Sequence, residues 1–321
     1  MYDDGMLSII DMLPFVKNRS YVVEFICERY DILLNAMPLQ LRHDIPATAF
    51  WFIILAILSI LLLAYTFWRK KDLKLVAFYL FMTTLAYMLD FVIFLCFRSY
   101  EYYPRIWDIP WYDQAFGTYL SQGFYVPVVA VFIAAFHLGF AWMVFFSVMF
   151  MGIEYLFIAL GIYKLNWWNP VYTLVGVCIF FYIGKVWIKW LMQASSRLVR
   201  IITLQCASYG LQAHFFAVPL MFDLFRITCG FFSEPARDSL FTLILILQAQ
   251  SLIIAVVCFY RFHWAILASI PLLLFGGELL LIHLSILHLE HFRGLYMLLA
   301  ANIVAVVFCY YFNRILSDVR K

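Results

Sequence analysis

Four carboxylates lie within runs of apolar residues that are long enough to form membrane-spanning helices: Asp90, Glu154, Asp223 and Glu278. A charge at the middle of a bilayer costs about 2.5 to 3.5 kcal/mol on insertion scales, so such residues face a bundle interior or a water-filled cavity. A carboxyl group that changes its charge near neutral pH is what a proton-coupled or cation-binding site requires. The alternative is structural, because the same group can join two helices by hydrogen bonds.

Each of these carboxylates falls in the later part of its apolar segment. Asp223 is close enough to the end to reach the headgroup region, where water solvates a charge. Asp90, Glu154 and Glu278 lie deeper. We therefore expect these three residues to be acidic ligands of a small solute, a cation or a proton, with an interhelical hydrogen bond as the alternative.

Polar residues and one proline recur on one face of the segment 200–225, at a spacing close to that of a helix. They are Gln205, Ser208, Gln212, Pro219 and Asp223. The next apolar segment adds a short polar patch at Gln248 and Ser251. We expect Gln205, Gln212 and Gln248 to line a polar internal surface, unless they only hold helices together.

Two glutamates also lie on stripes of small or polar residues. Ser147, Glu154 and Gly161 are spaced at i, i+7 and i+14, and Pro271, Glu278 and Ser285 repeat that spacing. A stripe of small residues lets a second helix approach closely in a membrane. Each stripe therefore predicts a helix contact that contains the carboxylate.

The composition shows what kind of element must position these residues. The 321 residues are 66% hydrophobic and only 13% charged, and the mean hydropathy is +0.92, outside the range of soluble domains. We expect a polytopic protein in a lipid bilayer. The net charge of +3 and the lack of a basic, aromatic surface motif exclude nucleic acid as a partner. The cysteines are scattered, and no enzyme, cofactor or metal motif is present, so we expect no catalytic residue, cofactor or metal.

About 20 apolar residues in a helix cross the roughly 30 Å hydrocarbon core of a bilayer. The sequence predicts an all-α bundle of about nine transmembrane helices, over residues 47–68, 75–97, 115–136, 140–163, 171–190, 200–225, 240–260, 265–284 and 295–311. Pro271 and the pair Gly276 and Gly277 leave a re-entrant hairpin as the alternative for the eighth span. Residues 1–46 contain no span, and "SYVVEFICERYDILLNAM" predicts an amphipathic helix at the membrane surface.

Basic residues indicate the orientation of the chain. One side of the predicted bundle carries twelve of them, namely Arg69, Lys70, Lys71, Lys74, Lys185, Lys189, Arg197, Arg200, Arg261, Arg314, Arg320 and Lys321. The other side carries six, namely Arg98, Arg105, Lys164, Arg226, Arg237 and Arg293. We expect the first side to be cytoplasmic, with the N-terminus outside and the C-terminus inside. The start "MYDDGMLSII" has no targeting features, so the bacterial cell membrane is the expected location.

The chain aligns with itself at a shift of 124 residues, which places "GIEYLFIALGI" on "GGELLLIHLSI" and Glu154 on Glu278. The same shift superposes spans two to five on spans six to nine. A tandem repeat predicts four regions: an outer N-terminal segment (1–46), a leading helix with a basic loop (47–74) and two four-helix units (75–198 and 199–321). Two such units would be related by an axis along the membrane normal, whereas chance similarity between leucine-rich helices is the alternative.

Three motifs stand out between residues 75 and 190: "RSYEYYP", "YLSQGFYVPVVAVF" and "GIEYLFIALGIYKLNWWNPVYT". They resemble a family of uncharacterised polytopic membrane proteins of Bacillus-type Firmicutes. The matching positions are Glu154, Tyr155, Leu156, Phe157, Gly161, Tyr163, Trp167, Trp168, Tyr172 and Thr173. The resemblance covers roughly residues 75–190. It implies a bacterial membrane location and carries no activity over to this chain.

Three functions are compatible with these features. The first is the binding or transport of a small solute, cation or proton through the intramembrane carboxylates. The second is a scaffold, sensor or complex subunit that does not transport, and that associates with a second copy or a membrane partner. An intramembrane enzyme acting on a lipid is least expected, because the chain lacks a metal motif such as D-D-x-x-D.

Overall fold

The computed structural model describes residues 46–193, 196–260, 262–290 and 293–317. The predicted amphipathic helix near the N-terminus lies outside these residues. Within them the chain forms nine long helical segments and four short strands. Eight of the nine segments are long and apolar enough to cross a membrane, which confirms the predicted all-α transmembrane bundle.

The first five helical segments lie within residues 47–192, the first half of the chain, and the second half begins at residue 197. They are α3 (Ala47–Lys70), α4 (Lys74–Asp90) continued by the π-helix η1 (Phe91–Cys96), α5 (Pro110–Leu120) continued by the π-helix η2 (Ser121–Tyr125) and α6 (Val126–Ala135), α7 (Phe140–Ala159) and α8 (Pro170–Met192). The last four are α9 (Arg197–Met221), α10 (Pro235–Phe259), α11 (Trp264–His283) and α12 (Arg293–Ser317). The eighth predicted span is thus one continuous helix, α11, and the re-entrant alternative is wrong.

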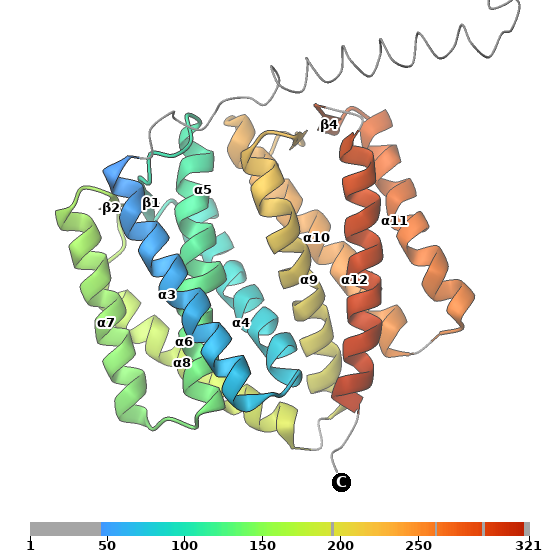
Figure 1. The fold of residues 1–321 in the computed structure, drawn as a ribbon. Helices are drawn as coiled ribbons and strands as arrows, with labels where there is room; N and C mark the ends of the chain where they lie inside the picture. The colour runs from blue at the N-terminus through green and yellow to red at the C-terminus, as the bar shows by residue number, and fades with distance from the viewer. Residues whose placement is uncertain (1–45, 194–195, 261, 291–292, 318–321) are drawn as a thin grey trace, which may run out of the picture.

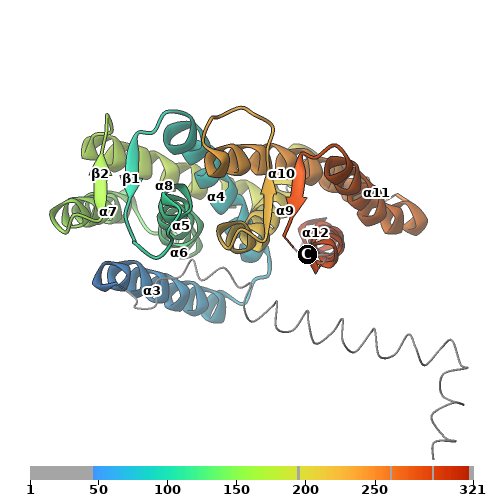
Figure 2. The ribbon, with the colours of Figure 1, turned by 90° about the horizontal axis from the view of Figure 1, so that it is seen from above.

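The segment that is not apolar enough to be counted among these eight is α9. It packs against α4, α10 and α12 near the middle of the bundle (Figures 1 and 2). Thr203, Ser208 and Gln212 of α9 are almost fully buried. A helix covered by its neighbours can carry such residues, since their polar groups are removed from lipid.

The backbones of α4 and α9 approach each other closely at Gly210. An added Cβ at this glycine would lie 2.7 Å from the backbone oxygen of Leu80 and 3.0 Å from Oγ1 of Thr84. The Thr84 hydroxyl lies 2.9 Å from the carbonyl oxygen of Leu80 and 2.5 Å from that of Cys206 on α9. Gly210 is therefore required by space, and the threonine joins the two helices across the gap it leaves.

The order of elements in the first half recurs in the second. In each half, a helix, a strand, a helix, a second helix, a strand and a final helix follow one another, with β1 (Tyr100–Tyr102), β2 (Tyr163–Leu165), β3 (Phe225–Ile227) and β4 (Leu287–Leu289) as the strands. β1 pairs antiparallel with β2, and β3 pairs with β4. The two ribbons lie at the same end of the bundle, as Figure 2 shows from above. β1 follows α4 and η1, and β2 follows α7, so the first ribbon connects the ends of two helices that are not consecutive in the sequence. The second ribbon connects the ends of α9 and α11 in the same way.

A Pro-x-x-Asp element stands at the same place in both halves. Pro110 and Pro235 are the first residues of α5 and α10, and the aspartate three residues later turns back to the preceding loop. Asp113 accepts hydrogen bonds from three backbone N–H groups, those of Arg105, Ile106 and Trp107. Asp238 accepts four, from Cys229, Gly230, Phe231 and Phe232. The two carboxylates thus supply acceptors to backbone N–H groups of loops that lie outside regular secondary structure.

The prediction of small and polar stripes on α7 and α11 is wrong for the last residue of each stripe, Gly161 and Ser285. Gly161 and Ser285 lie beyond the ends of these helices, with φ angles of 67° and 58°. A residue in the left-handed region ends a helix and redirects the chain, here into β2 and β4. Ser147 and Glu154 do share a buried face of α7, as predicted.

Substitution of Gly210 tests the close contact between α4 and α9. Gly210→Ala places a methyl group against backbone atoms, and we expect overpacking to lower the free energy of unfolding by about 1–3 kcal/mol. Thermal unfolding of the purified chain in detergent measures this change. Gly152→Ala on α7 is the matched control, because nothing lies within 4 Å of its added Cβ. Equal stability of the two variants would contradict the contact.

Removal of the loop-binding carboxylates tests the Pro-x-x-Asp element. Asp238→Ala leaves four backbone N–H groups without their acceptor, and we expect a loss of at least about 2 kcal/mol in the free energy of unfolding. Asp113→Ala should cost a similar or smaller amount. The control is Asp108→Ala, at an exposed aspartate in the loop that Asp113 binds. This substitution should leave the thermal midpoint unchanged. A midpoint for Asp238→Ala as high as that of the control would rule out the element's role.

Candidate functional site

A cavity of about 250 Å³ lies in the first half of the chain, and both Asp90 and Glu154 line it. Its walls come from α4, η2, α7 and α8, and the β1–β2 ribbon contributes Tyr100, Tyr102 and Tyr163 at one end. The structure thus brings together two of the three carboxylates that were predicted to bind a ligand. No Lys, Arg or His is among the described residues that line this cavity.

The two acids are buried and only partly paired. Asp90 is 5% exposed and Glu154 is 7% exposed. The hydroxyl of Tyr100 donates a hydrogen bond to Oδ1 of Asp90, whereas Oδ2 has no partner among the described residues. The hydroxyls of Tyr163 and Thr173 lie within reach of Glu154, but neither of them forms a hydrogen bond of regular geometry with its carboxyl oxygens. Oδ2 of Asp90 is therefore unpaired in the described chain, and the oxygens of Glu154 are only loosely held.

Two π-helical segments place residues of the cavity wall. Asp90 is the last residue of α4 before η1, and η2 supplies Ser121, Gln122 and Tyr125 to the wall. A π-helical turn inserts an extra residue into a helix and is frequently found at functional sites. Asp90 also lines a second, smaller cavity of about 100 Å³ that is bounded by α5, α9 and α10. It therefore stands at the boundary between two cavities.

The tyrosines of the ribbon keep their protons. Burial, followed by the charge of Asp90, raises the pKa of Tyr100 well above its ordinary value. Burial and the neighbouring Tyr102 and Glu154 do the same for Tyr163. A phenol that stays neutral can donate a hydrogen bond to a carboxylate, so the ribbon presents donors and aromatic rings to the acids beneath it.

Glu278, the third predicted acid, lies elsewhere. α7 and α11 lie on opposite sides of the bundle, at the left and the right of Figure 1, so Glu154 and Glu278 do not share a site. Nε2 of Gln250 lies 2.9 Å from Glu278 Oε1, and Nδ2 of Asn302 lies 3.1 and 3.2 Å from the two carboxyl oxygens. These bonds connect α10, α11 and α12, which is the geometry of an interhelical link.

The three predicted glutamines do not line the acidic cavity. Gln205 on α9 and Gln248 on α10 pair with each other, with Nε2 of Gln205 2.7 Å from Oε1 of Gln248. Gln212 turns back to Ser208 of its own helix. Asp223 follows the end of α9 with a φ of 55° and pairs with Arg226. The polar stripe of α9 thus serves contacts between helices and at a helix end.

Several residues of the site were not among the predicted ligands. Tyr100, Tyr102, Tyr163, Trp168 and Thr173 all line the cavity. The alternation of tyrosines in "YEY" is the signal that could have found two of them, because side chains two apart in a strand point to the same face. Tyr163 reaches the cavity because β2 pairs with β1, and no local pattern in the sequence indicates that pairing.

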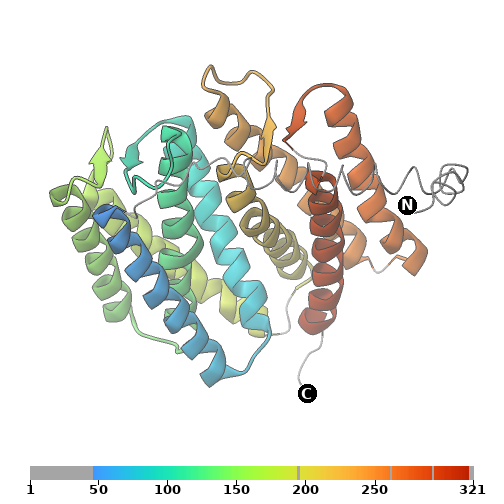
Figure 3. The same cartoon turned by 45° about the horizontal axis from the view of Figure 1, so that its top comes forward.

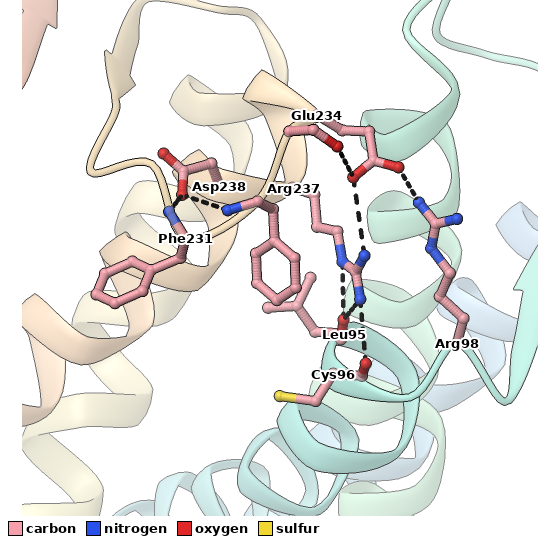
Figure 4. Close-up of polar contacts among 9 residues, drawn as sticks. Leu95, Cys96, Arg98, Phe231, Glu234, Arg237 and Asp238 are labelled. Carbon is pink, nitrogen blue, oxygen red and sulfur yellow. Dashed lines mark hydrogen bonds and ion pairs between the residues drawn. The ribbon is translucent and has the colours of Figure 1, made fainter.

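An arginine from the second half holds the helix that carries Asp90. Arg237, near the start of α10, points at the end of η1, as Figure 4 shows. Its Nη2 lies 2.7 Å from the carbonyl oxygen of Leu95 and 3.1 Å from that of Cys96. Glu234 accepts from Arg98 and lies 3.7 Å from Arg237. The guanidinium thereby caps carbonyl groups that a helix end leaves without partners.

Substitution of Arg237 tests this cap. Arg237→Met leaves two carbonyl groups near the end of η1 without their charged donor, and we expect the free energy of unfolding to fall by about 1.5–3 kcal/mol. Arg237→Lys should recover only part of the loss, because an ammonium cannot reproduce the planar fork of a guanidinium. The control is Arg98→Met, whose side chain is 45% exposed, and for which thermal unfolding should show little change. A larger effect of Arg98→Met would contradict the cap.

Comparison of the chain with family models, with curated proteins and with solved structures finds no match. The resemblance to membrane proteins of Bacillus-type Firmicutes therefore stays a prediction. The chain is an integral, multi-pass membrane protein on the evidence of its apolar helices, and its specific function has to be argued from the geometry of the acidic cavity.

Proposed function

We propose that this protein binds a small cation or a proton in the cavity lined by Asp90 and Glu154, and that it carries this ligand across the membrane. The observation that carries the proposal is a pair of buried acids in one cavity, of which Asp90 leaves Oδ2 unpaired in the described chain and Glu154 has no hydrogen bond of regular geometry. No basic side chain is among the described residues lining the cavity, and a buried charge needs a compensating partner. A cationic ligand or a bound proton supplies that partner.

The position of Asp90 supports a transport role. This residue lines both the larger cavity and the smaller one beside α9 and α10. It also lies at the junction between the regular helix α4 and the π-helix η1. A carboxyl group between two cavities can pass a proton or a cation from one to the other, and transporters place such groups within the membrane.

The repeated order of elements supports a division into a leading helix (47–74) and two four-helix units (75–198 and 199–321). α7 starts at residue 140 and α11 at residue 264, and the two helices end at residues 159 and 283. Both differences are 124 residues, which is the shift that aligns Glu154 with Glu278. In this proposal the ribbon end faces the outside of a bacterial cell membrane and the C-terminus lies in the cytoplasm. The excess of Lys and Arg at the opposite end supports that orientation.

A scaffold or complex subunit that does not transport is the second candidate. It is supported by the interhelical bonds of Glu278 with Gln250 and Asn302 and by the pairing of Gln205 with Gln248. These polar residues hold helices together without an open face for a ligand. The two candidates differ in what they require of Glu154, since only the first needs its charge.

Substitution of the two acids distinguishes these functions. We expect Asp90→Asn and Glu154→Gln to abolish cation-dependent pH changes inside liposomes that contain the purified protein, while the amount of folded protein stays normal. A trapped pH-sensitive dye measures the flux when gradients of inorganic and organic cations are imposed. Glu278→Gln is the matched control, because its carboxyl is already held by two amides.

The opposite pattern would remove the transport proposal. If Glu154→Gln keeps full flux while Glu154→Leu loses folded protein, the residue only makes hydrogen bonds between helices. If the unsubstituted protein moves no proton or cation under any imposed gradient, the scaffold role is favoured. Loss of flux in Glu278→Gln alone would move the site to the second half of the chain.

A further inference from the structure

We infer that the ligand of the acidic cavity is a small organic ammonium ion rather than a metal ion. This inference rests on the proposed function, since it names the class of cation that the cavity would take. It depends on the aromatic rings beside the acids, which the proposed function does not use. These rings come from β1, β2 and the loop before α8.

Four rings form one cluster at the end of the cavity. The ring centroids of Tyr102 and Tyr163 are 4.8 Å apart, those of Tyr100 and Tyr163 are 5.3 Å apart, and those of Tyr100 and Trp168 are 6.1 Å apart. All four residues line the cavity. Aromatic faces carry partial negative charge and attract cations, and quaternary ammonium ions are bound in this way by cages of aromatic rings.

Glu154 is the natural counter-ion within this arrangement. The residue is more than nine-tenths buried, it lines the cavity, and only the hydroxyls of Tyr163 and Thr173 lie beside it, without a hydrogen bond of regular geometry in the described chain. Asp90 differs because Tyr100 already donates to one of its oxygens. An ammonium ion would therefore pair with Glu154 and place its carbon groups against the rings.

The wall is poorly suited to a metal ion. Calcium takes six to eight oxygen ligands and magnesium requires a near-ideal octahedron. The described residues contain no group of three or more His, Cys, Asp or Glu side chains that could hold a metal. Apart from the two acids, most of the cavity is bounded by aromatic and aliphatic carbon from residues such as Phe150, Phe157 and Phe180. Carbon groups of an organic cation can contact such a wall, whereas a metal ion would lose its hydration without replacement.

Trp168 provides the sharpest test of the aromatic contribution. Its indole N–H lies 2.8 Å from Oγ1 of Thr173, and its ring lines the cavity. The neighbouring Trp167 is 52% exposed and donates to the carbonyl oxygen of Phe97 instead. Trp167 is not among the residues that line the cavity. The two adjacent tryptophans thus form a matched pair of test and control positions.

The experiment measures binding to the purified full-length protein by isothermal titration calorimetry at constant ionic strength. The probes are tetramethylammonium, ethylammonium, sodium, potassium, magnesium and calcium chlorides. We expect saturable binding of the ammonium ions and none of the metal ions. Trp168→Leu should weaken the binding of tetramethylammonium about ten-fold, Trp168→Phe less, and Trp167→Leu not at all. Glu154→Gln should abolish it.

The possible results separate the two proposals. If metal ions bind, if their binding requires Glu154, and if ammonium ions do not bind, the inference fails and the proposed function stands. If no probe binds and the protein moves no proton, both fail. Equal weakening by Trp168→Leu and Trp167→Leu would remove the aromatic contribution. The selectivity of the unsubstituted protein decides between ammonium and metal ions even if a tryptophan variant does not fold.

Discussion

The close approach of α4 and α9 at Gly210 is the contact on which the rest of the structure depends. Each of these helices is the first of its proposed four-helix unit. α6 packs against α4, and α10 and α12 pack against α9, whereas α7 and α11 pack mainly against other helices (Figure 3). A side chain at Gly210 would meet backbone atoms of α4, so this interface cannot relax by moving a rotamer. The contact also places α10 beside η1, which lets Arg237 hold the end of the helix that carries Asp90.

Two glutamates at equivalent positions show how neighbours decide the role of a buried acid. Glu154 and Glu278 lie at the same distance from the ends of α7 and α11, and both are almost fully buried. Glu278 meets two amides and becomes a link between helices. Glu154 faces a cavity with aromatic walls and has no hydrogen bond of regular geometry in the described chain. The cost of burying a carboxylate is thus met by hydrogen bonds in one half and, in our proposal, by a cation in the other.

Much of the fold could be predicted because hydropathy and length report directly on membrane spans. The predicted break between the third and fourth spans is present, at residues 136–139 between α6 and α7, and α11 follows the predicted eighth span almost residue for residue. The ribbons, the π-helical segments and the left-handed residues at Gly161 and Ser285 could not be predicted in the same way. Strand pairing joins residues about 60 positions apart, such as Tyr100 and Leu165, and no local pattern in the sequence encodes that partner.

The sequence by itself determined that this is a membrane protein of about nine long helices and that Asp90, Glu154 and Glu278 are buried in it, because these properties follow from the energy of placing each residue type in lipid. It did not show that Asp113 and Asp238 are buried as well. Only the tertiary structure decided which of those carboxylates meet. It placed Asp90 and Glu154 on the wall of one cavity together with Tyr100, Tyr102 and Tyr163. It also gave Glu278 two amide partners and paired Gln205 with Gln248. The reason is that a helical pattern defines the face of a side chain, whereas the neighbour on that face is set by the packing of distant segments.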